Sequence, residues 1–385
     1  MFRGMNFHEF RNHYEDLVSD SCYKMSIEFE SLRTRGGEMM ARSAGNRGTN
    51  RPKNRFVNVL PFDHTRVILS SVEGVDFSDY INANHISGYN SNGEFRGREY
   101  IATQAPLKNT VNDFWRLCWE LNATCVVMLA RYVDRPSSPD DFNPFQFSRP
   151  DREECTHYWP STSISEMYGE IEVEVMSEIL DGYRRSPHKW IISELKLRYK
   201  EQERRLRHYQ FLTWTHLESV DPPEALVHFV REVRKYAPSP ILGNPSNAPL
   251  IVHGSAGVGR TGTFIAVDIA LNQIEKKKAV NIASIVSQMR AQRVRYANDN
   301  DELLEICSII MTKVGMVHTE PQYVCIYKCV IVTLDEIEAN GIEFGDPAPG
   351  NHFERVVPDR EEASQPLQHL GLYDFDRAAN PNLLC

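Results

Sequence analysis

The sequence predicts a protein of the α/β class, and two observations carry that prediction. From Phe56 to about Val317, runs typical of strands alternate with runs typical of helices, which is the pattern of an α/β domain. Within this part, the apolar run 250–252 leads through several small residues to Arg260, where a helix is expected to open. We expect the strand at 250–252 to lie in the centre of a sheet.

The N-terminal part predicts helix followed by loop. Residues 5–33 carry a rough apolar stripe of helical period, which includes Phe10, Tyr14 and Leu17. The stripe is lost at 34–55, where Arg and Gly are frequent. We interpret 34–55 as a solvated loop in preference to a nucleic-acid patch.

The middle of the chain predicts a loop and then several strands. Four prolines between residues 130 and 154 preclude a regular element, so an exposed loop is expected there. Residues 170–214 contain several runs typical of strands. The segment after Arg260 has one apolar side, which predicts a buried helix.

The C-terminal part has a different character after about His318. The run 323–334 fits either one more strand or one more helix. From Gly345 onward the chain is rich in proline and charge, and we expect it to be loosely ordered.

Composition and charge exclude several classes of protein. The chain has 385 residues and a formal net charge of −9, which argues against nonspecific nucleic-acid binding. Its eight cysteines form no CxxC pair, so neither a zinc site nor another metal or cofactor is expected. No apolar run approaches the roughly 18 residues that a membrane span needs, and no secretory leader is recognised. We expect a soluble protein of the cytoplasm.

The stretch HGSAGVGRTG at 253–262 predicts a site for an anion. A tight glycine-rich loop turns backbone N–H groups inward, and the positive end of the helix dipole lies behind them. Arg260 adds a planar fork that suits two phosphate oxygens. A nucleotide P-loop is unsupported because no GK[ST] follows. The predicted phosphate-binding residues are Ser255, Ala256, Gly257, Val258, Gly259 and Arg260.

The same stretch resembles the signature loop of the protein tyrosine phosphatases, in which His and Cys are followed by five residues and Arg. Further segments resemble that family in the expected order. They are KNRF and LPFDHTRV at 53–67, DYINAN at 79–84, YIATQAPL at 100–107, NDFWRLCWE at 112–120, VVML at 126–129, YWP at 158–160 and MRAQR at 289–293. The resemblance covers roughly residues 26 to 317.

This resemblance implies one tyrosine-phosphatase-like domain with a twisted mixed sheet flanked by helices. We accordingly expect an N-terminal helical extension at 1–25, the domain at 26–317, and a partly disordered C-terminal extension at 318–385. It also implies that Phe56 flanks a phosphotyrosine ring and that Asn58 stands where an aspartate usually grips the peptide backbone.

The nucleophile position departs from the family. The family's cysteine attacks phosphorus as a thiolate, and the residue at that position here is Gly254, which has no atom that can attack. The neighbouring Ser255 is a weak candidate for a substitute, because in this loop its side chain is expected to stabilise the cradle.

Three further positions depart from the family pattern. His216 stands in place of the general-acid aspartate, and its side chain can also be read as an ordinary polar loop residue. Asn298, by counting along the pattern, replaces the glutamine that orients water. Glu154 replaces a lysine and brings negative charge near a phosphate site.

Four changes in four segments predict a pseudophosphatase, that is, a domain with no catalytic residues. The first hypothesis for its function is a module that binds phosphotyrosine proteins and so shields, interferes with or scaffolds signalling. The alternatives are a scaffold that ignores phosphate and a weak phosphatase with a substitute nucleophile. The layout is similar to single-domain phosphatase copies of polydnaviruses, which would place the protein in a host cytoplasm, and a nematode-type pseudophosphatase is the alternative origin.

Overall fold

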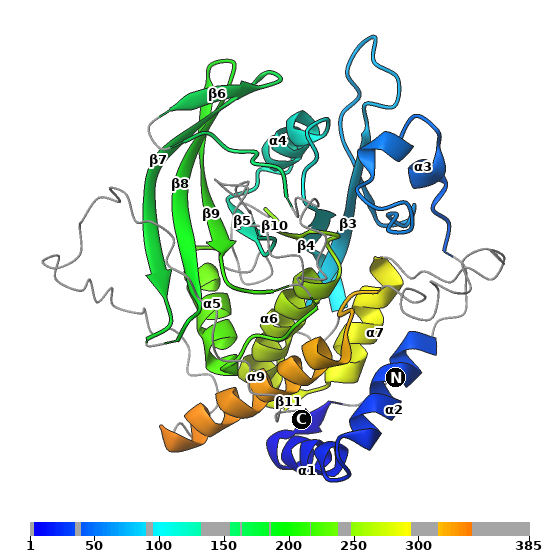
Figure 1. Ribbon diagram of the computed structural model, residues 1–385, viewed down its shortest axis with the longest axis vertical. Coiled ribbons are helices and arrows are strands. Elements are labelled where there is room, and N and C mark those ends of the chain that lie inside the picture. Colours follow the sequence, from blue (N-terminus) through cyan, green and yellow to red (C-terminus); the bar gives the residue numbers. More distant parts are fainter. Residues whose placement is uncertain are drawn as a thin grey trace, which may run out of the picture. The chain divides into compact units, whose positions relative to one another are not determined.

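A nine-stranded sheet organises the chain in the computed structural model, in the order β2-β3-β4-β10-β5-β9-β8-β7-β6 (Figure 1). Its centre consists of four parallel strands: β4 (Phe95–Gln104), β10 (Leu250–Gly254), β5 (Cys125–Met128) and β9 (Gln202–Phe211). The other neighbouring strands pair antiparallel, so the sheet is mixed. The predicted α/β class and the central position of the strand at 250–252 are confirmed.

Antiparallel strands extend the sheet on both sides of this centre. On the β4 side they are β2 (Arg66–Ile68) and β3 (Tyr80–Tyr89), and on the β9 side they are β8 (Lys189–Tyr199), β7 (Ile171–Gly182) and β6 (Ser165–Tyr168). The strands predicted within 170–214 are thus confirmed. A separate two-stranded sheet joins β1 (Met5–Asn6) to β11 (Ala279–Val280).

The structure describes residues 4–34, 40–89, 95–131, 155–161, 164–184, 186–215, 217–237, 248–293 and 315–340. Most of the loop predicted at 130–154 and the tail from Gly345 therefore lie outside the described residues.

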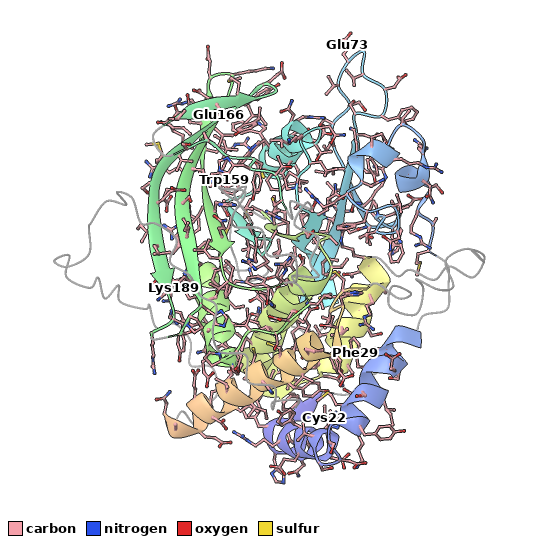
Figure 2. All side chains as sticks on the ribbon, in the orientation of Figure 1. Cys22, Phe29, Glu73, Trp159, Glu166 and Lys189 are labelled. Atoms are coloured by element: carbon pink, nitrogen blue, oxygen red, sulfur yellow. The ribbon has the colours of Figure 1, made fainter. Side chains whose placement is uncertain are left out.

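Helices cover both faces of the sheet (Figure 1). One face packs against α4 (Val111–Glu120), whose side chains Phe114, Trp115 and Leu117 are buried with inward residues of every strand of the sheet except β6. Trp159, labelled in Figure 2, belongs to the same apolar cluster. The other face packs against α5 (Pro223–Tyr236), α6 (Gly259–Lys277) and α7 (Ile282–Gln292). Both faces of the parallel centre are therefore dry, as parallel strands require.

The predicted helical region 5–33 is two helices, α1 (Phe7–Val18) and α2 (Tyr23–Thr34). The helix is interrupted because Ser21 and Cys22 adopt left-handed backbone conformations, with φ of 46° and 61°. Phe29, on α2, is labelled in Figure 2. The Cζ atom of Arg290, on α7, lies over the phenyl ring of Phe29, 5.1 Å from the ring centroid. This contact fastens the N-terminal helices to the domain.

The described part of the predicted loop 34–55 contains two short helices, α3 (Ser43–Asn46) and η1 (Arg51–Lys53). The Asp63 carboxylate accepts hydrogen bonds from the backbone N–H groups of Ser43 and Ala44, at 2.7 and 3.0 Å. An acidic cap of this kind stabilises a helix start, so this segment is more structured than its composition predicts.

The run 323–334, for which the sequence fits strand or helix, lies in the helix α9 (Glu320–Ala339). The chain divides into two units, Met1–Asp335 and Glu336–Cys385, and the second is described only as far as residue 340. The boundaries predicted at residues 25 and 317 stay predictions. In the described part of the chain, no helix combines the length and apolarity needed to cross a membrane.

Candidate functional site

The predicted anion site forms where the central strand β10 ends and α6 begins. We call residues 254–260 the cradle. Gly254 is the last residue of β10 and pairs with Gln104 at the end of β4. The loop turns at Gly257, whose φ is +69°, and a Cβ there would lie 2.1 Å from the carbonyl oxygen of Thr103. Only glycine fits both the left-handed backbone and this close approach.

Two further glycines allow a distant segment to reach the start of α6. A Cβ at Gly262 would lie 2.4 Å from the backbone nitrogen of Val317, and one at Gly259 would lie 3.0 Å from Oε1 of Gln322. The Val317 N–H donates to the carbonyl of Val258, at 3.2 Å. The spacing G-x-G-x-x-G therefore follows from packing as well as from anion binding.

The cradle holds a row of backbone donors. Among the described residues, no backbone hydrogen bond uses an N–H of residues 255–258 as its donor. These groups lie at the start of the 19-residue helix α6, where the positive end of the helix dipole adds to them. Together they form a site that suits an anion.

Arg293 holds the carbonyl side of the same loop. Its guanidinium donates to the carbonyl oxygens of Gly257 and Ala256, at 2.8 and 3.2 Å. It also donates to the side-chain oxygens of Asn84 and Asn82 on β3, at 2.7 and 3.0 Å. Burial lowers the pKa of Arg293 to about 9. Arg293 thus connects the carbonyls of Ala256 and Gly257 to β3, and the N–H groups on the other side of the loop can bind a ligand.

Arg260 lies in the first turn of α6 with only 4% of its surface exposed. Its Nη1 donates to the carbonyl oxygen of Trp214, at 2.8 Å. Trp214 is itself buried, and its indole N–H donates to the carbonyl of Glu218, at 2.9 Å. The predicted phosphate-binding arginine is thus fixed between the cradle and the segment that begins at Trp214.

Below the cradle, a buried polar chain supports the end of β10. The hydroxyl of Tyr158 lies 2.7 Å from Nε2 of His253 and 2.7 Å from Nε2 of His208. Burial lowers the pKa of each histidine to about 3, so both imidazoles are neutral at pH 7. Tyr158 can then donate to one ring and accept from the other.

The segments 53–56 and 60–67 resemble a phosphotyrosine recognition loop, and we call residues 53–58, which include Phe56 and Asn58, the recognition loop. The backbone N–H of Arg55 donates to the side chain of Gln104, which in turn donates to the carbonyl of Lys53, at 2.9 and 2.8 Å. The next residue, Ala105, donates its N–H to the carbonyl of Ser255, at 3.1 Å. The end of β4 therefore joins the recognition loop to the cradle.

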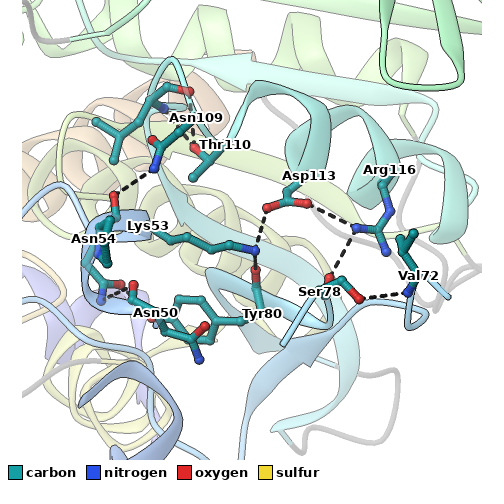
Figure 3. Close-up of polar contacts among 12 residues, drawn as sticks. Asn50, Lys53, Asn54, Val72, Ser78, Tyr80, Asn109, Thr110, Asp113 and Arg116 are labelled. Carbon is teal, nitrogen blue, oxygen red and sulfur yellow. Dashed lines mark hydrogen bonds and ion pairs between the residues drawn. The ribbon is translucent and has the colours of Figure 1, made fainter. Parts of the chain in front are cut away.

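Polar contacts also fasten the base of the recognition loop to the domain (Figure 3). The Lys53 ammonium lies 3.0 Å from the Asp113 carboxylate, and Tyr80 donates to the side chain of Asn54. At the tip, Phe56 and Asn58 are partly buried, whereas Val57 is 91% exposed. Phe56 and Asn58 follow directly on Arg55, whose backbone N–H is bound by Gln104 at the end of β4.

At the base of the cradle, Gly254 leaves space where a side chain would lie. A Cβ built there would lie 3.3 Å from Oγ1 of Thr261 and 4.0 Å from Cβ of Arg260. Thr261 is fully buried, and its hydroxyl has no hydrogen-bond partner among the described residues. The backbone of Gly254 has no positive φ, so the glycine there is not required by conformation.

Three of the predicted departures, Glu154, His216 and Asn298, lie outside the described residues. Sequence reasoning missed Thr261 and Gln322, and it named Arg293 only as part of a motif. Gln322 is a buried polar residue near the start of an apolar helix, and a glutamine in that setting is the signal that could have drawn attention to it.

Comparison with known proteins shows which family the chain is similar to. The family described as protein-tyrosine phosphatase matches residues 50–312. Receptor-type tyrosine-protein phosphatase F of Danio rerio is 33% identical over 312 residues, which are 81% of this chain and 15% of that protein. Its namesake from Bos taurus is 35% identical over 307 residues, 80% of this chain and 14% of that protein. Tyrosine-protein phosphatase Lar of Drosophila melanogaster is 34% identical over 323 residues, which are 82% of this chain and 14% of that protein. The chain thus spans a small part of the length of these relatives.

Proposed function

The chain belongs to the protein-tyrosine phosphatase family, and on that premise we propose that it binds phosphotyrosine proteins without hydrolysing them. Such binding shields the phosphate from active enzymes, so the protein interferes with or scaffolds tyrosine-phosphorylation signalling. The proposed ligands are cytoplasmic phosphotyrosine proteins and not nucleic acids.

The observation that carries this proposal is Gly254. By the resemblance described above, the attacking cysteine of the family aligns with this residue, and glycine has no side-chain atom that can form a phosphoryl intermediate. The neighbouring Ser255 is 92% buried by its surroundings, with only 8% of its surface exposed, and its carbonyl is bound by Ala105. By the same resemblance its side chain is expected to stabilise the cradle, so we treat Ser255 as a poor substitute nucleophile.

Binding is supported because the anion-binding parts do not depend on the missing cysteine. The N–H groups of residues 255–258, the dipole of α6 and the guanidinium of Arg260 all lie at one place. A thiolate at position 254 would repel an incoming phosphate dianion, and glycine removes that repulsion. Phe56, on the recognition loop, offers a ring face for stacking on the tyrosine.

The experiment is a calorimetric titration of the purified protein with a phosphotyrosine peptide and with its unphosphorylated twin. We expect binding of the phosphorylated peptide alone, with no release of inorganic phosphate over hours. Arg260→Ala should abolish binding, and Arg260→Lys should lose much of it, because a point charge cannot reproduce the two-pronged contact.

The matched control is Arg205→Ala, which removes the same charge from an exposed position near the start of β9. It should bind like the unaltered chain. Equal binding of both peptides, or capture of cell proteins that survives Arg260→Ala, would favour the scaffold function. Turnover that is abolished by Ser255→Ala would favour the weak enzyme.

A further inference from the structure

The Thr261 hydroxyl is a buried polar group with no hydrogen-bond partner among the described residues. Thr261 has 0% of its surface exposed, and its Oγ1 makes no hydrogen bond within the described part of the chain. Two residues later on the same helix, Thr263 donates its hydroxyl to the carbonyl of Gly259, at 3.1 Å. Since buried hydroxyls are nearly always paired, the orphaned Thr261 hydroxyl points to a partner that binds from outside the chain.

The orphaned hydroxyl faces the space at Gly254. The Cβ position of residue 254 lies 3.3 Å from Oγ1 of Thr261 and 4.0 Å from Cβ of Arg260. Apart from the residues flanking the glycine, these are the only atoms of the described chain within 4 Å of that position. The space therefore has one polar side-chain group on its wall, and it adjoins the N–H groups of the cradle.

We propose that Thr261 is a direct ligand of the bound phosphoryl group, with its hydroxyl donating to a phosphate oxygen that occupies the space left by the missing side chain at Gly254. This inference rests on the proposed function, and it adds a binding residue and a deeper seat for the phosphate. With a side chain at position 254, that oxygen and the hydroxyl could not meet.

A phosphate oxygen fits this place better than an isolated water. A buried water needs two to four polar partners, and Thr261 supplies one. In the proposed complex, the other oxygens of the phosphate group are bound by the N–H groups of residues 255–258 and by Arg260, so the group is already held in place. The hydroxyl then contributes a charge-assisted hydrogen bond, which is stronger than a neutral one.

The test compares Thr261→Val with Thr261→Ser in a titration with the phosphotyrosine peptide and with inorganic phosphate. Valine keeps the shape and removes the hydroxyl, so affinity should fall about tenfold or more for both probes, as for the loss of a hydrogen bond to a charged group. Serine keeps the hydroxyl and should bind within about threefold of the unaltered chain.

Gly254→Ala provides an independent arm, because a methyl group there fills the space in front of Oγ1. Its loss of affinity should resemble that of Thr261→Val. In a double-mutant cycle the two losses should not add, since each removes the same hydrogen bond.

Thermal unfolding without ligand separates a binding role from a structural one. Valine removes an unpaired buried hydroxyl, so the Tm of Thr261→Val should stay equal or rise. A fall in Tm with unchanged affinity would overturn the inference and leave the proposed function intact if Arg260→Ala still abolishes binding. If the unaltered chain binds neither probe, the proposed function fails, and the inference fails with it.

Discussion

The cradle and the recognition loop, which serve one site in the proposed function, are held in different ways. The cradle is mostly buried, and Arg293 binds the carbonyls of Ala256 and Gly257. A Cβ at Gly257, or at Gly262 just beyond the cradle, would clash with backbone atoms, and one at Gly259 would be crowded by Gln322. The recognition loop is attached at its base by Lys53 and Arg55 and carries its tip toward solvent. The proposed phosphate site is therefore built into the core, whereas the proposed contacts to the rest of a ligand lie on a surface loop. Changes in the cradle should affect stability and binding together, and changes in the loop tip should affect binding alone.

Arg293→Ala should break the cradle most severely. Three buried acceptors, on Gly257, Asn82 and Asn84, and the partly buried carbonyl of Ala256 would lose their donor. Because an unsatisfied buried polar group costs about 1–3 kcal/mol, we expect the free energy of unfolding to fall by at least about 3 kcal/mol. Urea unfolding measures the change, with Arg205→Ala as the control that should leave stability unaltered. Full stability with lost ligand binding would show that Arg293 supports the ligand and not the fold.

Lowering the pH should destabilise the region around the cradle first, because two buried histidines, His253 and His208, lie there. The recognition loop contains no histidine. The folded-state pKa values of His253 and His208 lie near 3, below the ordinary value near 6.5, so the unfolded chain binds more protons between these values. Stability is therefore full above about pH 6.5 and falls as pH drops toward about 3, by up to about 1.4 kcal/mol per pH unit for each histidine. Urea unfolding from pH 7 to pH 5 measures the slope.

The substitution His208→Gln tests whether the buried histidines cause this pH dependence. It should reduce the slope of stability against pH by the contribution of one histidine, up to about 1.4 kcal/mol per pH unit. His8→Gln, at an exposed position on α1, should leave the slope unchanged. An identical slope in all three proteins would place the acid sensitivity elsewhere.

Phe56→Ala sharpens the comparison at the recognition loop. Loss of stacking and burial should weaken binding of the phosphotyrosine peptide by about 1–2 kcal/mol. The free energy of unfolding should change by less than about 0.5 kcal/mol, since the side chain is only partly buried at the loop tip. Calorimetry and urea unfolding on the same sample give both quantities, and Tyr23→Ala, an exposed aromatic change on α2, is the control. A large loss of stability would mean that the loop tip belongs to the core.

Gly254→Cys should have the smallest effect of these substitutions, because phosphatase turnover is expected to stay almost unchanged. The backbone accepts a side chain there, because the nearest atom of another described residue is Thr261 Oγ1 at 3.3 Å. Even so, we expect hydrolysis of an aryl phosphate to stay near background, because the resemblance implies that His216, Asn298 and Glu154 also stand where the family has other residues. Gly254→Ser is the matched control. Robust turnover in the cysteine variant alone would show that the nucleophile was the one missing part.

The strand, the turn and the helix around the cradle were predictable from the sequence because local rules dominate there. A strand, a glycine-rich turn and a helix follow one another between residues 250 and 277, so periodicity and glycine positions suffice. The break between α1 and α2 was not predicted, because Ser21 and Cys22 adopt left-handed conformations without a glycine to announce them.

Contacts between distant segments were beyond the sequence. Nothing in G-V-G-R-T-G indicates that Val317 and Gln322 pack on its glycines, since those residues come more than fifty positions later. The role of Arg293 was hidden for the same reason, because its acceptors lie on β3 and in the cradle. Thr261 gave no signal in the sequence either, because a threonine within a helix is common. Only the structure shows that its hydroxyl is buried without a hydrogen-bond partner among the described residues.

The packing of Val317 and Gln322 on the glycines of α6 has a consequence for synthesis on the ribosome. Strand β10 pairs with β4, whose residues were made about 150 positions earlier, and the first turn of α6 is covered only when residues 316–322 have emerged. Folding that relies on contacts so remote in sequence is slow, and it leaves intermediates with exposed apolar surface. The nascent chain therefore passes through a long interval in which the central sheet can form but the anion site is incomplete. A phosphorylated ligand should accordingly slow unfolding of the finished protein while leaving its folding rate unchanged.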